Sequence, residues 1–128
     1  MIPANTLVLI GEDEPDNQVI LQTVVEALVG VRAEVAADGL AVLASVERER
    51  PRMILLDLMM PGLDGFQVTR QLKGNPATAS IPIVAVSAMA RPDDREAALA
   101  AGCDDFVRKP FELDDLEAVI RTYLENGR

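Results

Sequence analysis

The sequence lacks histidine, the side chain that most often serves as general base, nucleophile activator or transition-metal ligand. Its chemistry therefore depends on carboxylates, hydroxyls and lysine. Cysteine is nearly absent too: Cys103 is the only one, which excludes an intramolecular disulfide, a CxxC pair and a zinc cluster. We expect Cys103 to be a small buried side chain near the end of a helix.

Basic residues are scarce, with 12 Lys and Arg against 21 Asp and Glu, and the net charge is −9. A sequence-independent grip on nucleic acid or on an anionic membrane needs clustered Lys and Arg, so we expect neither partner. No apolar run reaches transmembrane length, and the first residues lack the pattern of a signal peptide. We therefore expect a cytoplasmic protein that binds a cation or the basic surface of a partner protein.

The residues that are present indicate one globular domain. The chain has 128 residues, of which 49% are apolar and 26% charged. Short apolar runs alternate with segments of helical spacing, which predicts an open α/β sheet with crossover helices. The expected strands are residues 6–10, 31–35, 53–56, 83–86 and 105–108. The second run alternates apolar with charged residues, so we place it at an edge of the sheet.

The first predicted helix runs from Pro15 to a stop at Gly30. Its helical spacing predicts one apolar face. That face comprises Val19, Ile20, Val24, Ala27 and Leu28.

Polar residues stand directly after four of the apolar strands. Glu12 and Asp13 follow the first strand, Asp57 the third, Ser87 the fourth and Lys109 the fifth. In an open parallel sheet the carboxyl ends of the strands form the ligand-binding crevice, so we expect these residues to converge. Each alone would be an ordinary loop residue. Together they predict one site, and the apolar neighbours of Asp57 make its desolvation costly enough to indicate a role.

Three neighbouring carboxylates, those of Glu12, Asp13 and Asp57, would repel one another. A hard cation with oxygen ligands relieves that repulsion, and Mg²⁺ fits because it accepts a few carboxylates and keeps several waters. Lys109 adds a compact ammonium that can approach a carboxylate or a phosphoryl oxygen as a point charge.

In this order and spacing, these motifs resemble the receiver domain of two-component response regulators, especially the chemotaxis-type single-domain regulators, from residue 6 to residue 124. The matching pieces are Glu12-Asp13, Asp57, Met60-Pro61-Gly62-Leu63-Asp64-Gly65, Ser87-Ala88 and Lys109-Pro110-Phe111. The resemblance implies a flavodoxin-like, doubly wound fold: a five-stranded parallel sheet in the order 2-1-3-4-5, flanked by five helices. It implies a single receiver domain over residues 1–128 and, with four residues left after Leu124, no output domain.

The resemblance further implies that Asp57 accepts a phosphoryl group from a histidine kinase or a histidine phosphotransfer protein. Mg²⁺ would be held by Asp13, Asp57 and the backbone carbonyl of Met59, with Glu12 reaching it through water. Ser87 and Lys109 would contact the phosphoryl oxygens. The protein would be a signalling switch rather than an enzyme, although it would assist its own phosphoryl transfer and hydrolysis.

The implied output is a change of surface. The Ser87 hydroxyl would be drawn toward the phosphoryl group and Phe106 would repack, which would alter the face made by the fourth helix, fifth strand and fifth helix for a downstream protein target. Phe106 lacks the hydroxyl of the commoner tyrosine. Met59 and Met89 stand where the family often has polar groups that orient water, so we expect a long-lived phosphoryl state.

Other functions fit the residues less well. A phosphatase of the haloacid dehalogenase type needs a second acid two residues after the nucleophile, where Met59 stands. Nucleotide binding needs a glycine-rich turn after the first strand, where Glu12 and Asp13 lie instead. The rival that stays open is a receiver-like scaffold that binds partners without being phosphorylated.

Overall fold

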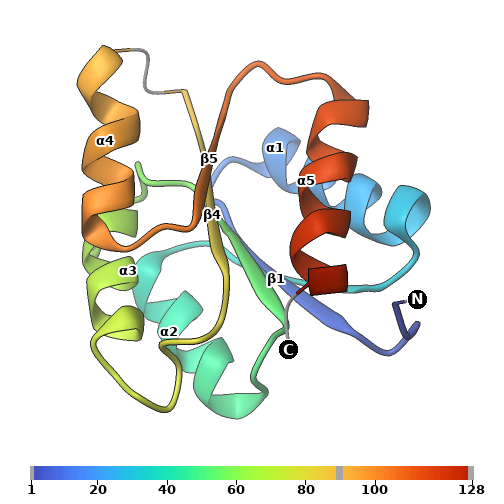
Figure 1. The fold of residues 1–128 in the computed structure, drawn as a ribbon, viewed down its shortest axis with the longest axis horizontal. Coiled ribbons are helices and arrows are strands. Elements are labelled where there is room, and N and C mark those ends of the chain that lie inside the picture. The colour runs from blue at the N-terminus through green and yellow to red at the C-terminus, as the bar shows by residue number, and fades with distance from the viewer. Residues whose placement is uncertain (1, 89–90, 127–128) are drawn as a thin grey trace.

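The computed structural model describes residues 2–88 and 91–126, and these fold around one parallel sheet (Figure 1). Its strands are β1 (Leu7–Gly11), β2 (Arg32–Ala36), β3 (Met53–Leu56), β4 (Ile83–Ser87) and β5 (Asp105–Arg108). Their order across the sheet is β2-β1-β3-β4-β5. The predicted strand order and the edge position of β2 are therefore confirmed.

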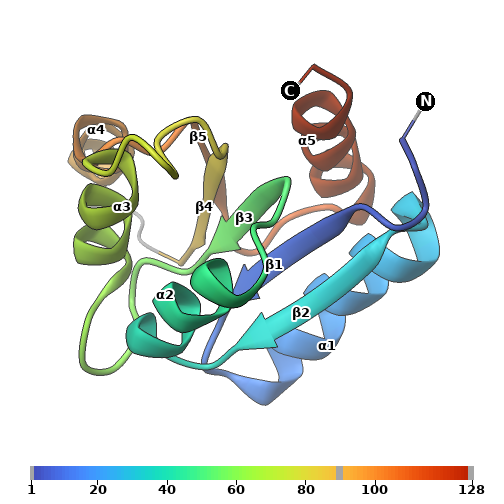
Figure 2. The same cartoon turned by 90° about the horizontal axis from the view of Figure 1, so that it is seen from below.

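Helices cover both faces of the sheet, as the doubly wound architecture requires (Figure 2). One face carries α2 (Gly39–Arg48), α3 (Gly65–Lys73) and α4 (Pro92–Ala101). The other carries α5 (Leu113–Asn126) and α1 (Pro15–Thr23), which continues as the π-helical segment η1 (Val24–Val29). Among the described residues, no helix combines the length and apolarity needed to span a membrane.

The central strand β3 explains why the core divides into two layers. Ile54 and Leu56 pack with the helices of one face, whereas Met53 and Leu55 pack with those of the other. Successive side chains of a strand point to opposite faces, so a strand covered on both faces must be apolar at every position. All four residues are completely buried, with 0% of their surface exposed.

The prediction of which residues form the apolar, buried face of the first helix was wrong. Of its five residues only Val24 is buried, whereas Val19 and Ile20 are 62% and 41% exposed. The helix instead packs on the sheet through Leu21, Val24 and Val25. It is apolar on two sides, so periodicity did not determine which side docks. The change to π-helical turns at Val24 also breaks the 3.6-residue period on which the prediction depended.

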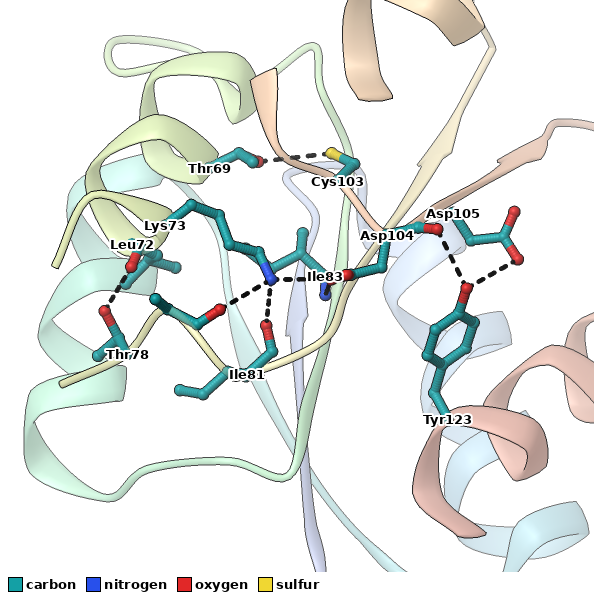
Figure 3. Close-up of polar contacts among 11 residues, drawn as sticks. Thr69, Leu72, Lys73, Thr78, Ile81, Ile83, Cys103, Asp104, Asp105 and Tyr123 are labelled. Carbon is teal, nitrogen blue, oxygen red and sulfur yellow. Dashed lines mark hydrogen bonds and ion pairs between the residues drawn. The ribbon is translucent and has the colours of Figure 1, made fainter. Parts of the chain in front are cut away.

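Lys73 forms a clamp at the starts of β4 and β5 (Figure 3). Lys73 Nζ donates to the carbonyl oxygens of Ala79 (3.2 Å) and Ile81 (2.9 Å) and pairs with Asp104 Oδ2 at 2.9 Å. Asp104 Oδ2 also accepts the N–H of Ile83 at 2.8 Å. The clamp therefore ties α3 to the starts of two neighbouring strands.

Cys103 is buried after the end of α4, as predicted, with 5% of its surface exposed. Its sulfur lies 3.6 Å from the Thr69 hydroxyl of α3 (Figure 3). Burial raises the pKa of the Cys103 thiol above its ordinary value.

Candidate functional site

The strand register brings the predicted site residues to one edge of the sheet. Gly11, the last residue of β1, is paired with Leu56, the last residue of β3. Immediately beyond this pair the N–H of Asp57 donates to the Gly11 carbonyl at 2.8 Å. At the end of β4, the Ser87 carbonyl accepts the N–H of Lys109 at 2.8 Å. Asp57 and Lys109 therefore both lie just beyond the carboxyl ends of the strands, at the same edge of the sheet.

The Lys109 side chain joins two carboxylates from different strand ends. Its Nζ donates to Glu12 Oε1 at 2.8 Å and to Asp57 Oδ2 at 3.0 Å. Burial works to lower the pKa of Lys109, but the hydrogen bonds to the two carboxylates outweigh it, so this pKa lies above its ordinary value. The ammonium is therefore charged and already placed beside Asp57.

Asp57 is 8% exposed, and both of its carboxylate oxygens have protein partners. Oδ2 accepts from Lys109, and Oδ1 accepts the backbone N–H of Met59 at 2.9 Å. Charge-assisted hydrogen bonds of this kind hold the carboxylate in one orientation. The buried carboxylate therefore lies at the rim of the sheet, as the sequence predicted.

Three acidic residues meet at this rim. Glu12, Asp13 and Asp57 each offer a carboxylate oxygen, and these atoms lie within 4.8 Å of one another. Glu12 is completely buried, and burial raises the pKa of its carboxyl group against the opposing bonds from Lys109 and the Glu14 N–H. Asp13 is exposed. An all-oxygen donor set that is open on one side fits a hard cation such as Mg²⁺.

A hollow and a groove flank the acidic residues. The hollow, of about 560 Å³, lies at the mouth of the site between Asp13 and the segment that follows β3, and includes Met59. The groove, of about 580 Å³, is lined mainly by apolar residues of α1 and the start of α5, among them Ile20 and Leu113, with Lys109 also in its lining.

The response regulator receiver domain family model matches residues 8–121. This chain belongs to that family. Curated relatives include the response regulator MprA of Mycobacterium leprae, 43% identical over 77% of this chain and 42% of that protein. The probable transcriptional regulator ycf27 of Porphyridium aerugineum is 38% identical over 91% of this chain and 47% of that protein. The receiver domain thus spans about half the length of these relatives.

Solved receiver domains share the fold of this one. The receiver domain of the sensor histidine kinase PA1611 from Pseudomonas aeruginosa PAO1 is 34% identical, with a TM-score of 0.87 over 96% of this chain and all of that one. That structure is described with a magnesium ion coordinated in the active site cleft. The receiver domain of a signal transduction histidine kinase from Syntrophus aciditrophicus is 30% identical, with a TM-score of 0.87 over 94% of this chain and 90% of that one.

The two residues predicted to act as the switch belong to strands β4 and β5, whereas the acidic residues stand in the loops that follow β1 and β3. Ser87 is the last residue of β4 and is completely buried. Phe106 is paired with Ala85 inside β5 and packs partly buried against the core layer of α2, α3 and α4. Phe106 is thus a core residue and is not part of the acidic cluster of Glu12, Asp13 and Asp57. Met89, the second methionine of the hydrolysis prediction, lies outside the described residues.

Two residues support the site in ways that the sequence analysis did not assign to them. Gln18 of α1 donates its side-chain amide to the Glu12 carbonyl at 2.7 Å, and a polar residue on a helix gives no signal of such a bond. Gly65 begins α3, and a Cβ there would lie 2.6 Å from both the Asp57 carbonyl oxygen and Leu58 Cα. The glycine after Asp64 was a signal that could have been read as a close approach of two backbones.

Proposed function

We propose that this receiver domain is a phosphorylation-dependent signalling switch in which Asp57 accepts a phosphoryl group from a phosphohistidine donor. The observation that carries the proposal is the placement of Asp57. Its carboxylate is nearly buried at the end of β3, 3.0 Å from Lys109 Nζ and grouped with Glu12 and Asp13. The donor is a histidine kinase or a histidine phosphotransfer protein, since this chain has no histidine.

In the proposed transfer an Asp57 oxygen forms a bond to phosphorus while the bond from phosphorus to the donor's imidazole nitrogen breaks, and the departing nitrogen keeps the electron pair. The Met59 N–H orients the Asp57 carboxylate before the reaction. Lys109 and the Ser87 hydroxyl contact the phosphoryl oxygens. A transfer of this kind needs mainly positioning and charge neutralisation, which these groups supply.

Mg²⁺ is the proposed cofactor, and when bound it would neutralise charge on the phosphoryl oxygens. Asp13, Asp57 and the Met59 carbonyl would hold it, with Glu12 acting through water. The two Glu12 oxygens already accept from Lys109 Nζ and from the Glu14 N–H at 3.1 Å, which supports an indirect role. The magnesium ion in the receiver domain of PA1611 supports the same choice of metal.

The output follows from the connection between the site and β5. Drawing the Ser87 hydroxyl toward the phosphoryl group would leave room for Phe106 to repack, and the face of α4, β5 and α5 would change for a downstream protein target. The net charge of −9 favours a protein target over nucleic acid. In this proposal the switch is a cytoplasmic receiver unit whose core spans residues 6–124.

A protein donor is supported by the apolar groove beside Lys109. Val19 and Ile20 of α1 and Leu113 of α5 are large apolar residues that remain exposed there. Exposed apolar groups that line one groove are typical of a surface that a protein partner covers. A donor covering this groove would bring its phosphohistidine within reach of Asp57.

The test is incubation with Mg²⁺ and acetyl phosphate, followed by intact-mass measurement. We expect one added phosphoryl group, absent in Asp57→Asn and retained in Asp114→Asn, an exposed acid on α5 that serves as the matched control. If no Mg²⁺ concentration yields an adduct, the phosphorylation proposal is wrong, and an unphosphorylated receiver-like scaffold becomes the better interpretation.

A further inference from the structure

The loop that carries the acidic pair enters α1 without a side-chain cap. Glu14 occupies the N-cap position and makes no side-chain capping bond, and Pro15 opens the helix. A capping side chain normally fixes the direction in which a loop joins a helix. Here that constraint must come from another group.

Gln18 supplies the missing constraint from within the helix. Its Nε2 donates to the Glu12 carbonyl at 2.7 Å, across the turn that contains Asp13. On the other side the Glu12 N–H donates to the Ala36 carbonyl of β2 at 3.0 Å. The main chain at Glu12 is therefore held both by the sheet and by α1.

The hydrogen bond from Gln18 to the Glu12 carbonyl opposes the loop movement that repulsion among the carboxylates would favour. Three carboxylates with oxygens within 4.8 Å repel one another, and the exposed Asp13 is the member that a loop movement would carry away most easily. A loop that opens in this way would have to be drawn back each time a cation binds. Groups that hold metal ligands in place are commonly worth about 10–100-fold in metal affinity.

We propose that Gln18 is a positioning residue for the acidic site: its amide holds the Glu12 carbonyl and keeps Asp13 directed toward Glu12 and Asp57 for a divalent cation. The proposal rests on the magnesium site of the proposed function. Gln18 acts on the loop rather than on the cation.

The experiment compares Gln18→Met, which keeps an unbranched side chain but removes the donor, with Gln22→Met one turn further along α1. Gln18→Ser, which is too short to reach the carbonyl, is the second variant. Circular dichroism and thermal melts first identify a temperature at which all four proteins are folded. Calorimetric titration with Mg²⁺ then gives the dissociation constants. We expect about a tenfold increase for both Gln18 variants and no change for Gln22→Met.

A second readout separates positioning from loss of structure. The rate of labelling by acetyl phosphate is measured against Mg²⁺ concentration. A positioning role raises the half-saturating concentration by the same factor as the dissociation constant and leaves the rate at saturating Mg²⁺ unchanged. Unchanged Mg²⁺ affinity in both Gln18 variants, or an equal loss in Gln22→Met, would overturn the proposal.

The outcome also distinguishes this proposal from the proposed function. If the wild-type protein binds Mg²⁺ but is never phosphorylated, the phosphorylation proposal fails, and the positioning role is still decided by the calorimetry. If the wild-type protein does not bind Mg²⁺, both fail.

Discussion

At the scale of single residues, Lys109 shows how one cation organises the site. Its ammonium is hydrogen-bonded to Glu12 and Asp57 before any phosphoryl group arrives. An arginine would present a planar fork in place of a point charge and would not be equivalent there. The buried contacts also mean that Lys109 would lose little freedom in the proposed phosphorylation, because its side chain is only 13% exposed.

Met59 lies where a side chain can influence water at Asp57. Its backbone N–H donates to Asp57 Oδ1, and the residue is 62% exposed at the mouth of the site. A thioether orients water poorly, so we expect the aspartyl phosphate to be long-lived. Met59→Asn, alone or combined with a polar residue at Met89, should shorten its half-life several-fold, as followed by intact mass after removal of the donor. A short half-life that neither substitution changes would contradict this prediction.

Cys103 should make stability depend on pH above neutrality. Burial raises the pKa of the Cys103 thiol in the folded protein. The contribution of this thiol to the free energy of unfolding is therefore fully present below the thiol pKa of about 8.5 in unfolded chains, and it is lost as pH rises through the folded-state pKa. Urea unfolding should therefore show wild type losing stability relative to Cys103→Ala from about pH 8.5 upward. A constant difference between the two proteins would refute it. Iodoacetamide should label Cys103 only after unfolding.

At the scale of elements, the junction between β3 and α3 depends on a glycine. A side chain at Gly65 would meet the backbone at Asp57 and Leu58 at 2.6 Å, so α3 could not start where it does. We expect Gly65→Ala to lower the free energy of unfolding by about 1–3 kcal/mol and to slow labelling of Asp57. Gln71→Ala, at an exposed position on the same helix, should do neither. Equal urea midpoints for the two variants would show that the junction relaxes freely.

Helix α1 is apolar on two sides, and the outer side is available for a partner. Ile20→Glu should slow transfer from a protein donor by about tenfold or more, because a charge would replace apolar contact in the groove. Transfer would be timed from the fastest donor in a panel of autophosphorylated histidine kinases. Labelling by acetyl phosphate should not change. Leu40→Glu, at an exposed apolar position of α2 on the other face of the sheet, is the control. A similar loss in both variants would exclude a specific docking surface.

At the scale of the whole molecule, the acidic residues should couple folding to binding of the proposed cation. Their mutual repulsion exists only in the folded state, where their oxygens lie within 4.8 Å of one another. Mg²⁺ should therefore stabilise the protein, by about 2.7 kcal/mol at 100 times its dissociation constant. Thermal melts should show a rise in unfolding temperature with Mg²⁺ that EDTA reverses and that Asp13→Asn weakens. An equal rise in Asp13→Asn would place the cation elsewhere.

The sequence by itself determined the sheet and the residues at its edge. Apolar runs in β1, β3 and β4 specify strands covered on both faces, and in a parallel sheet residues such as Asp57 and Lys109 that follow those strands must meet. Local patterns suffice for this because strand direction and crossover handedness leave few topologies.

The tertiary structure decided between arrangements that fit the sequence patterns equally well. Either apolar side of α1 satisfies the helical period, and only packing against the sheet buried Leu21 and left Ile20 exposed. The bond from Gln18 to Glu12 and the close approach at Gly65 likewise depend on distances between backbones. A period in the sequence records which residues share a face, whereas the partner of that face is settled by competition among all the surfaces of the folded chain.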